Sequence, residues 1–153
     1  MRRKADPLTR GQHRKLGSDL FNYTWSLLDQ KGRSTKKNDE MLNAAHASRY
    51  HWGHAGTPLN LSIGEWQLSR VYAILGRGEP ALYHGRRSLE IARRNRLGRF
   101  YLAYAYEALA RAAAVAGERP ARNRYVRKAR RIGDDIRIRD ERRMLLEDLA
   151  TIP

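Results

Sequence analysis

The chain has 153 residues, a formal net charge of +15 and no cysteine. This length is sufficient for one domain with a buried core, and the lack of cysteine excludes disulfides and thiolate metal sites. No apolar run approaches the roughly 18 residues of a membrane-spanning helix, and no apolar stretch follows the N-terminal charges as a secretory signal requires. We therefore expect a cytoplasmic protein with no membrane partner.

The positive charge is concentrated in two parts of the chain. Residues 1–37 contain ten Lys or Arg against three Asp, and residues 77–143 contain nineteen against eight Asp or Glu. Such an excess indicates an anionic partner, such as nucleic acid, an acidic protein surface or a phosphorylated ligand. Arginine is also a good helix former that commonly occupies solvated helix faces, so both interpretations remain open.

The N-terminal region is predicted to differ from the rest of the chain. Residues 1–17 are basic and include one proline and two glycines, which favours a flexible basic arm or a short extra helix. The remainder, 18–153, is expected to form one helical domain. Ser18 and Asp19 can accept hydrogen bonds from free backbone N–H groups, so the first helix is predicted from about Asp19 to Gln30.

The second helix is predicted from about Lys37 to Trp52. Ser34 or Thr35 is a suitable N-terminal cap. Positions separated by four, three and four residues fall on one helical face, and here they are Met41, Ala45, Ser48 and Trp52. Glycines and a proline after Trp52 predict a loop.

Residues 68–92 and 109–129 repeat one pattern. In each, an apolar helix with small residues ends at a glycine, a short break with a proline follows, and a second helix begins. The glycines, Gly76 and Gly117, are 41 residues apart. The pattern predicts two antiparallel helix hairpins. The second helix of the first hairpin carries a stripe of small residues, which are Ala81, Gly85, Ser88 and Ala92.

A last helix is predicted over residues 138–150, with Leu145, Leu146 and Leu149 as its apolar side chains. Terminal helices of repeat proteins often cover an otherwise exposed apolar end, and we expect that role for this helix. No segment has a sustained period of two residues, so no strand is predicted.

The repeated pattern resembles the tetratricopeptide repeat (TPR), in which each unit contains two antiparallel helices. One unit matches at Leu68, Ser69, Tyr72, Gly76, Ala81 and Ser88, and the next at Leu109, Ala110, Ala113, Gly117 and Ala129. The helix pair at 19–52 has the size of a further unit. Arg122 departs from the small residue of the family pattern. The resemblance implies a divergent bacterial member with an all-α fold: a right-handed solenoid of about three units plus a C-terminal capping helix.

The TPR resemblance also implies a concave face lined by the first helix of each unit. The corresponding positions are Asn22, Ser26, Ile63, Trp66, Arg70, Ile74, Tyr104, Glu107, Arg111 and Val115. Trp, Tyr and Arg commonly anchor protein partners. Our first hypothesis is therefore a non-enzymatic module that binds an acidic protein or peptide through Trp66, Arg70, Tyr104 and Arg111. The alternative for the two aromatic residues is ordinary packing between units.

Three of the five histidines, His46, His51 and His54, lie within nine residues. Imidazole binds zinc, nickel and iron, so a small metal-dependent enzyme or a ligand-binding site is one hypothesis, with Asp19 or Glu65 supplying a carboxylate. However, His46 and His51 lie about 140° apart around a helix and do not share a face. The other interpretation is that both histidines hydrogen-bond to neighbouring helices.

Residues 119–131 contain seven basic side chains. Those that can share one exposed face are Arg124, Arg127, Lys128 and Arg131. They could follow a phosphate backbone, which makes an RNA- or DNA-associated accessory protein, binding through this helix and the basic arm, a further hypothesis. The alternative is a solvated face that pairs with nearby acidic residues, including Asp134, Asp135 and Asp140.

No Gly-rich phosphate loop, nucleophile elbow or paired-carboxylate motif is present in the sequence. We therefore expect no enzymatic activity and no cofactor. The expected oligomeric state is a monomer or a homodimer.

Overall fold

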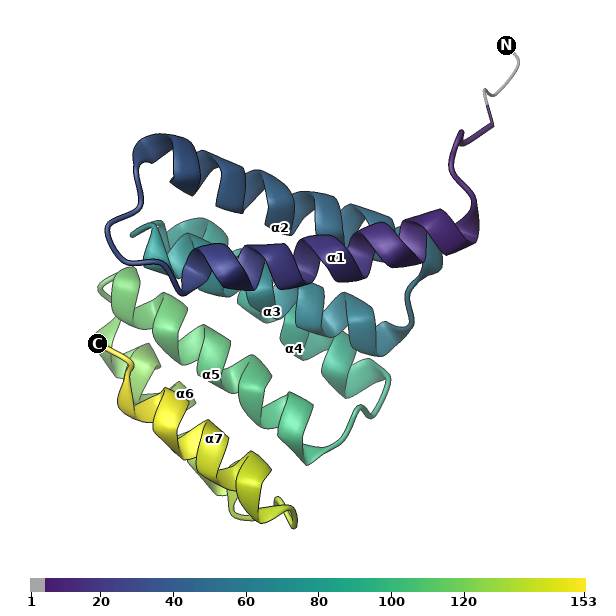
Figure 1. The fold of residues 1–153 in the computed structure, drawn as a ribbon. Helices are drawn as coiled ribbons and strands as arrows, with labels where there is room; N and C mark the ends of the chain where they lie inside the picture. The colour runs from purple at the N-terminus through teal and green to yellow at the C-terminus, as the bar shows by residue number, and fades with distance from the viewer. Residues whose placement is uncertain (1–4) are drawn as a thin grey trace.

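The computed structural model describes residues 5–153, and within them the chain forms seven α-helices and no strand (Figure 1). They are α1 (Arg10–Leu28), α2 (Thr35–Ala55), α3 (Pro58–Ile74), α4 (Gly78–Arg94), α5 (Arg99–Val115), α6 (Arg119–Gly133) and α7 (Arg139–Ala150). The closest pairs are α1 with α2, α3 with α4, and α5 with α6. The prediction of an all-α fold built from paired helices is confirmed. No helix among the described residues has the length and apolar character needed to span a membrane.

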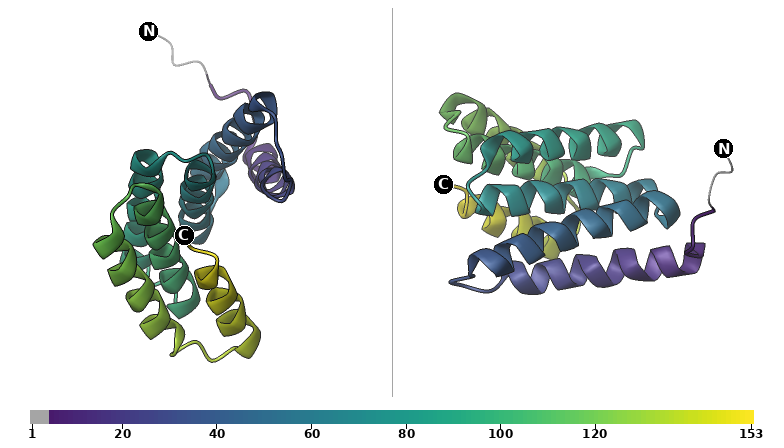
Figure 2. Two further views of the ribbon diagram at one scale, coloured as in Figure 1. Left: turned by 90° about the vertical axis from the view of Figure 1, so that its left-hand side faces the viewer. Right: turned by 90° about the horizontal axis from the view of Figure 1, so that it is seen from above.

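The three hairpins pack side by side, and α3 contacts both α1 and α5. The last helix, α7, packs against α5 and α6. In Figures 1 and 2, α1 and α7 lie on the same side of the row formed by α3 to α6. We call this side, formed by α1, α3, α5 and α7, the open face.

The first helix begins at Arg10, so the expectation of a start at Asp19 is wrong. The start is defined by Thr9, whose hydroxyl accepts a hydrogen bond from the Gln12 N–H at 3.2 Å. In return, Gln12 Oε1 accepts from the Thr9 N–H at 2.7 Å, and this reciprocal pair is a capping box. The later part of the expected arm is therefore helical, while residues 1–4 of that arm lie outside the described residues.

Gly17 lies inside α1 rather than ending it, because its missing side chain makes room for Trp52. A Cβ atom at Gly17 would lie 2.8 Å from Trp52 Cδ2, which is closer than van der Waals contact allows. Ser48 Oγ also donates to the Gly17 carbonyl at 2.7 Å. The glycine therefore allows α1 and α2 to approach closely.

Gly76 and Gly117 end α3 and α5 in the same way. Both adopt a positive φ, +74° and +77°, which L-residues with a side chain rarely adopt. The residue after each glycine donates its N–H to the carbonyl five residues earlier, at 2.9 Å in both turns. The prediction of equivalent glycine caps is confirmed.

The predicted buried stripes of α2 and α4 are confirmed. The buried members are Met41, Ala45, Ser48 and Trp52 in α2, and Ala81, Gly85, Ser88 and Ala92 in α4. A Cβ at Gly85 would lie 3.0 Å from Leu109 Cδ2, so the small residues bring α4 close to α5. In α7, Leu145 and Leu149 are buried, whereas Leu146 is exposed.

Candidate functional site

A pocket of about 240 Å³ lies on the open face. Phe21 and Trp25 of α1 line it from one side, and Met144 and Asp148 of α7 line it from the other. The remaining lining comes from the helices between, mainly Ile63 and Trp66 of α3 and Phe100, Tyr101 and Tyr104 of α5. Half of the lining residues are therefore aromatic, and the pocket combines side chains from three hairpin units and the last helix.

Aromatic contacts connect the helices across this pocket. The ring centroids of Trp25 and Trp66 are 5.4 Å apart, and those of Trp66 and Tyr104 are 5.7 Å apart in an edge-to-face arrangement. Phe100 and Tyr104 follow at 4.9 Å. Tilted and edge-to-face rings attract each other beyond simple burial. The aromatic surface is therefore preformed, with Trp25, Trp66 and Phe100 still partly exposed.

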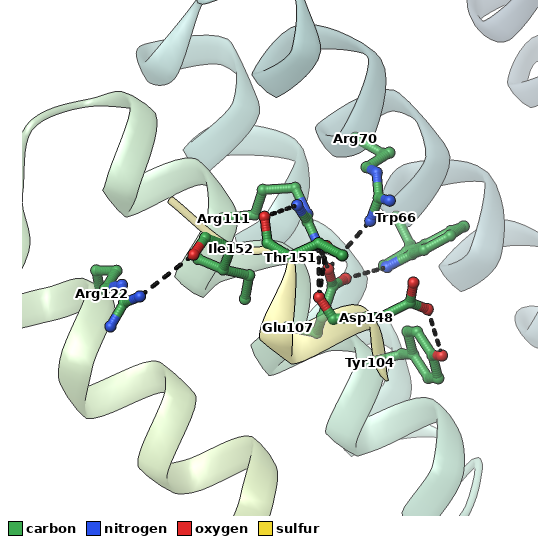
Figure 3. A network of polar contacts seen from close by, with 9 residues as sticks. All are labelled: Trp66, Arg70, Tyr104, Glu107, Arg111, Arg122, Asp148, Thr151 and Ile152. Atoms are coloured by element: carbon green, nitrogen blue, oxygen red, sulfur yellow. Dashed lines mark hydrogen bonds and ion pairs between the residues drawn. The ribbon is translucent and has the colours of Figure 1, made fainter. Parts of the chain in front are cut away.

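The carboxylate of Glu107 is fully buried at the centre of a polar network (Figure 3). Trp66 Nε1 donates to Glu107 Oε2 at 3.0 Å, and Arg70 Nη1 donates to Oε1 at 3.1 Å. Arg111 donates to the same Oε1 from Nε at 2.9 Å and from Nη2 at 2.7 Å. A buried carboxylate requires such partners, because leaving water is very costly for an unpaired charge.

Arg70 and Arg111 occupy equivalent positions in two successive units, since they are 41 residues apart like the glycine caps. Both guanidinium groups converge on Glu107. Burial lowers the pKa of Arg70, and the nearby charge of Glu107 opposes that effect. The network therefore holds α3 against α5 through one carboxylate that two guanidinium groups share.

The last helix is joined to α5 by polar contacts from the same network (Figure 3). Arg111 Nη2 donates to the Asp148 carbonyl at 3.0 Å and to Thr151 Oγ1 at 2.9 Å. The Tyr104 hydroxyl donates to Asp148 Oδ2 at 2.6 Å. Burial, together with this hydrogen bond, raises the pKa of Tyr104. These contacts hold α7 beside the pocket.

Arg122, which departs from the TPR pattern, binds the end of the chain. Its Nε donates to the Pro153 carbonyl at 3.0 Å, and its Nη2 donates to the Ile152 carbonyl at 3.3 Å. The side chain of Ile152 is buried. Arg122 therefore fastens the C-terminal residues to α6, a role that a small residue could not perform.

The residues expected to contact a partner are divided by the structure into accessible and inaccessible groups. Ile63 and Trp66 line the pocket and are partly exposed, whereas Tyr104 lines it but is buried. Glu107 and Arg111 do not present charge to a partner, because they are buried and bound to each other. This corrects the expectation for both residues, and its physical reason is the presence of α7 over this part of α5.

The other expected positions lie outside the pocket lining. They are Asn22, Ser26, Arg70, Ile74 and Val115. The large apolar and aromatic side chains of the pocket that were not predicted from the sequence are Phe21, Trp25, Phe100, Tyr101 and Met144. A signal existed for part of this group, because Phe21 and Trp25, and likewise Phe100 and Tyr104, are four residues apart and thus share a helical face.

The three clustered histidines separate into two places. His46 Nε2 lies 2.8 Å from the Tyr72 hydroxyl of α3, whereas His51 Nδ1 lies 2.8 Å from His13 Nδ1 of α1. The interpretation that His46 and His51 hydrogen-bond to neighbouring helices is confirmed. A single site containing His46, His51 and His54 is not formed, because the two faces of α2 contact different helices.

Glu65, one proposed carboxylate partner, is buried in a second polar cluster near His46. Arg49 Nε and Arg87 Nε donate to its Oε1 at 3.0 and 3.2 Å, and His84 Nδ1 donates to its Oε2 at 2.6 Å. Burial favours a higher pKa for Glu65, but the hydrogen bond from His84 and the neighbouring positive charges outweigh it and lower the pKa. The cluster joins α2, α3 and α4.

His13, absent from our sequence hypotheses, is buried where α1 meets the C-terminal end of α2. Its Nε2 lies 2.9 Å from Asp6 Oδ2, and Asp6 Oδ2 also lies 3.5 Å from His54 Nδ1. Asp19, the other proposed carboxylate, pairs with Lys15 instead. The histidines therefore meet a carboxylate that precedes α1.

The basic side chains of α6 are exposed, and none of them forms an ion pair with another residue between 5 and 153. This set is Arg124, Arg127, Lys128 and Arg131. The expected pairing with nearby acidic residues does not occur, since Asp135 lies 3.9 Å from Arg99 and Asp140 lies 3.3 Å from Arg143. Uncompensated positive charge therefore remains on this helix.

No protein-family model matches the chain, and no curated protein or solved structure is detectably similar to it.

Proposed function

We propose that this chain is a non-enzymatic helical-repeat module, similar to TPR proteins, that binds a segment of a partner protein on its open face. The paired helices and the equivalent turns at Gly76 and Gly117 support the repeat architecture. The single observation that carries the binding function is the aromatic pocket between α1 and α7.

The chemistry of this pocket favours a bulky apolar side chain from the partner. Trp, Tyr and Met are enriched at protein interfaces, and residues in well-packed pockets contribute most of the binding energy. Met144 remains 51% exposed beside the aromatic rings. The volume of about 240 Å³ is sufficient, because an apolar cavity of about 150 Å³ accommodates a benzene ring.

The charge of the partner is recognised outside the pocket in this proposal. Arg70 and Arg111 share the single carboxylate of Glu107, so both guanidinium groups are already engaged in ion pairs at the base of the open face. The net charge of +15 attracts an acidic partner over longer distances. We infer a segment in which acidic residues flank one or two large apolar anchors.

Selection from a random peptide library tests this function, because it does not require the partner to be identified first. Trp25 and Trp66 line the pocket and report binding through their fluorescence, which we expect to change as a selected peptide is titrated. Met144→Lys places a charge in the pocket and should weaken binding by roughly 30-fold, the effect of losing about 2 kcal/mol.

Leu146→Lys is the matched control, because Leu146 is an exposed apolar residue of the same helix outside the pocket lining. It should leave the affinity unchanged. Equal affinity of the selected peptides for Met144→Lys and wild type would contradict binding in this pocket.

A second candidate function is nucleic-acid binding through α6. It is favoured by the exposed, unpaired basic set on this helix and by a depression beside it that includes Arg93, Arg94 and Tyr125. Changing Arg124, Arg127 and Arg131 together to Gln should reduce the salt dependence of RNA binding by about one unit of slope per lost phosphate contact. An unchanged slope would exclude this surface.

A further inference from the structure

We propose that Asp6, His13 and His54 form a binding site for a divalent transition-metal ion, with zinc as the best fit. The candidate ligand atoms are Asp6 Oδ2, His13 Nε2 and one nitrogen of His54, Nδ1. One ligand atom from each of the three residues lies within 4.8 Å of the other two. This site is distinct from the open face, because it lies where the segment before α1 meets the end of α2.

The spacing of these atoms is close to that of bound ligands. Asp6 Oδ2 lies 2.9 Å from His13 Nε2 and 3.5 Å from His54 Nδ1. Two atoms coordinated tetrahedrally to zinc at about 2.0–2.2 Å lie roughly 3.3–3.6 Å apart. An ion between the carboxylate and the two imidazoles requires a small outward movement of these atoms and a rotation of the His54 ring.

The surrounding contacts orient two of the ligands as outer-shell partners do in metal sites. His13 is 3% exposed, and its second ring nitrogen, Nδ1, lies 2.8 Å from His51 Nδ1. When Nε2 binds an ion, Nδ1 carries the proton and donates it to His51. Likewise, Asp6 Oδ1 accepts from the Leu8 N–H at 2.9 Å, which directs Oδ2 towards the histidines.

His54 is the adjustable ligand. Its ring is stacked on that of His13, with centroids 4.3 Å apart and planes 10° apart. Because the rings are nearly parallel, His13 Nε2 and His54 Nδ1 do not yet point at a common centre. The side chain is 41% exposed and follows Gly53 in the last turn of α2, and it can turn towards the ion. Three protein ligands leave a fourth position for water in a tetrahedral zinc site.

The donor set also indicates the class of ion. Two imidazoles and one carboxylate suit zinc and other first-row transition metals, whereas magnesium and calcium prefer sites made of oxygen ligands. Bound metal would fasten Asp6 to both α1 and α2. Its role is therefore to stabilise the first hairpin and the segment that precedes it.

Titration of the full-length, tag-free chain with Zn²⁺, followed by calorimetry, tests this site. We expect one ion per chain, and we expect Co²⁺ to give the visible absorption of a tetrahedral complex. His54→Ala and Asp6→Ala should each weaken Zn²⁺ binding by about ten-fold or more, since loss of outer-shell groups alone costs 10–100-fold. Both residues are exposed, so these variants should remain folded.

His46→Ala is the matched control, because His46 is a histidine of the same helix that contacts Tyr72 instead. It should bind Zn²⁺ with wild-type affinity. The proposal is overturned if the wild-type chain binds no zinc, if His54→Ala binds as tightly as wild type, or if His46→Ala weakens binding equally.

Discussion

Replacing Glu107 by Gln tests the electrostatic role of the network beneath the aromatic pocket. The substitution preserves size but removes the negative charge that both Arg70 and Arg111 contact. The side chain of Glu107 is inaccessible to water, and those of Arg70 and Arg111 are 20% and 10% exposed. Two guanidinium groups would then remain close together with little solvent and without the carboxylate that they share.

Removing one partner of a buried ion pair costs about 3–5 kcal/mol. We expect the lower end of this range, about 3 kcal/mol, because Arg70 retains some contact with water. A domain of this size is stable by about 5–15 kcal/mol, so Glu107→Gln should shift the urea midpoint strongly while leaving the m-value unchanged. A loss below about 1 kcal/mol, as expected for a surface pair, would refute the reasoning.

Two companion variants separate charge from packing. Glu90→Gln is the matched control, since Glu90 forms an exposed pair with Arg94 at 3.2 Å, and its unfolding curve should overlap that of wild type. Combining Glu107→Leu with Arg70→Met and Arg111→Met removes all three charges and should recover much of the lost stability, as apolar replacements of buried ion networks often do. No recovery would show that uncompensated charge is not the cause.

Two further predictions concern the first hairpin. Gly17→Ala should lower the free energy of unfolding in urea by about 1–3 kcal/mol, because the added Cβ overlaps Trp52. Gly11→Ala is the control, since Gly11 lies in an open position, and it should not destabilise the fold. Equal effects of the two variants would contradict the close approach of α1 and α2. The pKa of His46 is lowered from its ordinary 6.5, mainly because its ring is partly withdrawn from water. The neutral form of His46 therefore supports the fold above pH 6.5. This support is lost as the pH falls towards the lower pKa of the folded state. His46→Gln should therefore make stability less pH-dependent across about pH 7 to 5, and an unchanged pH profile would exclude this contribution.

Much of the secondary structure could be predicted because its signals are local. Gly76 and Gly117 supply the positive φ that ends a helix, and small residues four apart mark the faces where helices approach. The early start of α1 was also encoded locally, since Thr9 and Gln12 have the spacing of a capping box. The presence of Gly17 obscured it, and only the packing of Trp52 explains why a glycine lies inside this helix.

The candidate site could be predicted only in part. Part of the aromatic character of the open face was expected, because the resemblance to TPR proteins implied that Trp66 and Tyr104 line a concave face. Phe21, Trp25 and Met144 join them because α1 and α7 lie on the same side of the row. That position of α7 depends on contacts between residues far apart in sequence, such as Tyr104 with Asp148.

The sequence by itself determined the paired helices, their glycine caps and the stripes of small residues, because each depends on neighbours within one or two turns. Only the tertiary structure decided that Arg70 and Arg111 share the carboxylate of Glu107, and that His13 meets His54. These outcomes depend on which helix faces are brought together. An arginine that is exposed and one that is buried in an ion pair cannot be distinguished from their neighbours in the sequence. Only the packing of the helices distinguishes them.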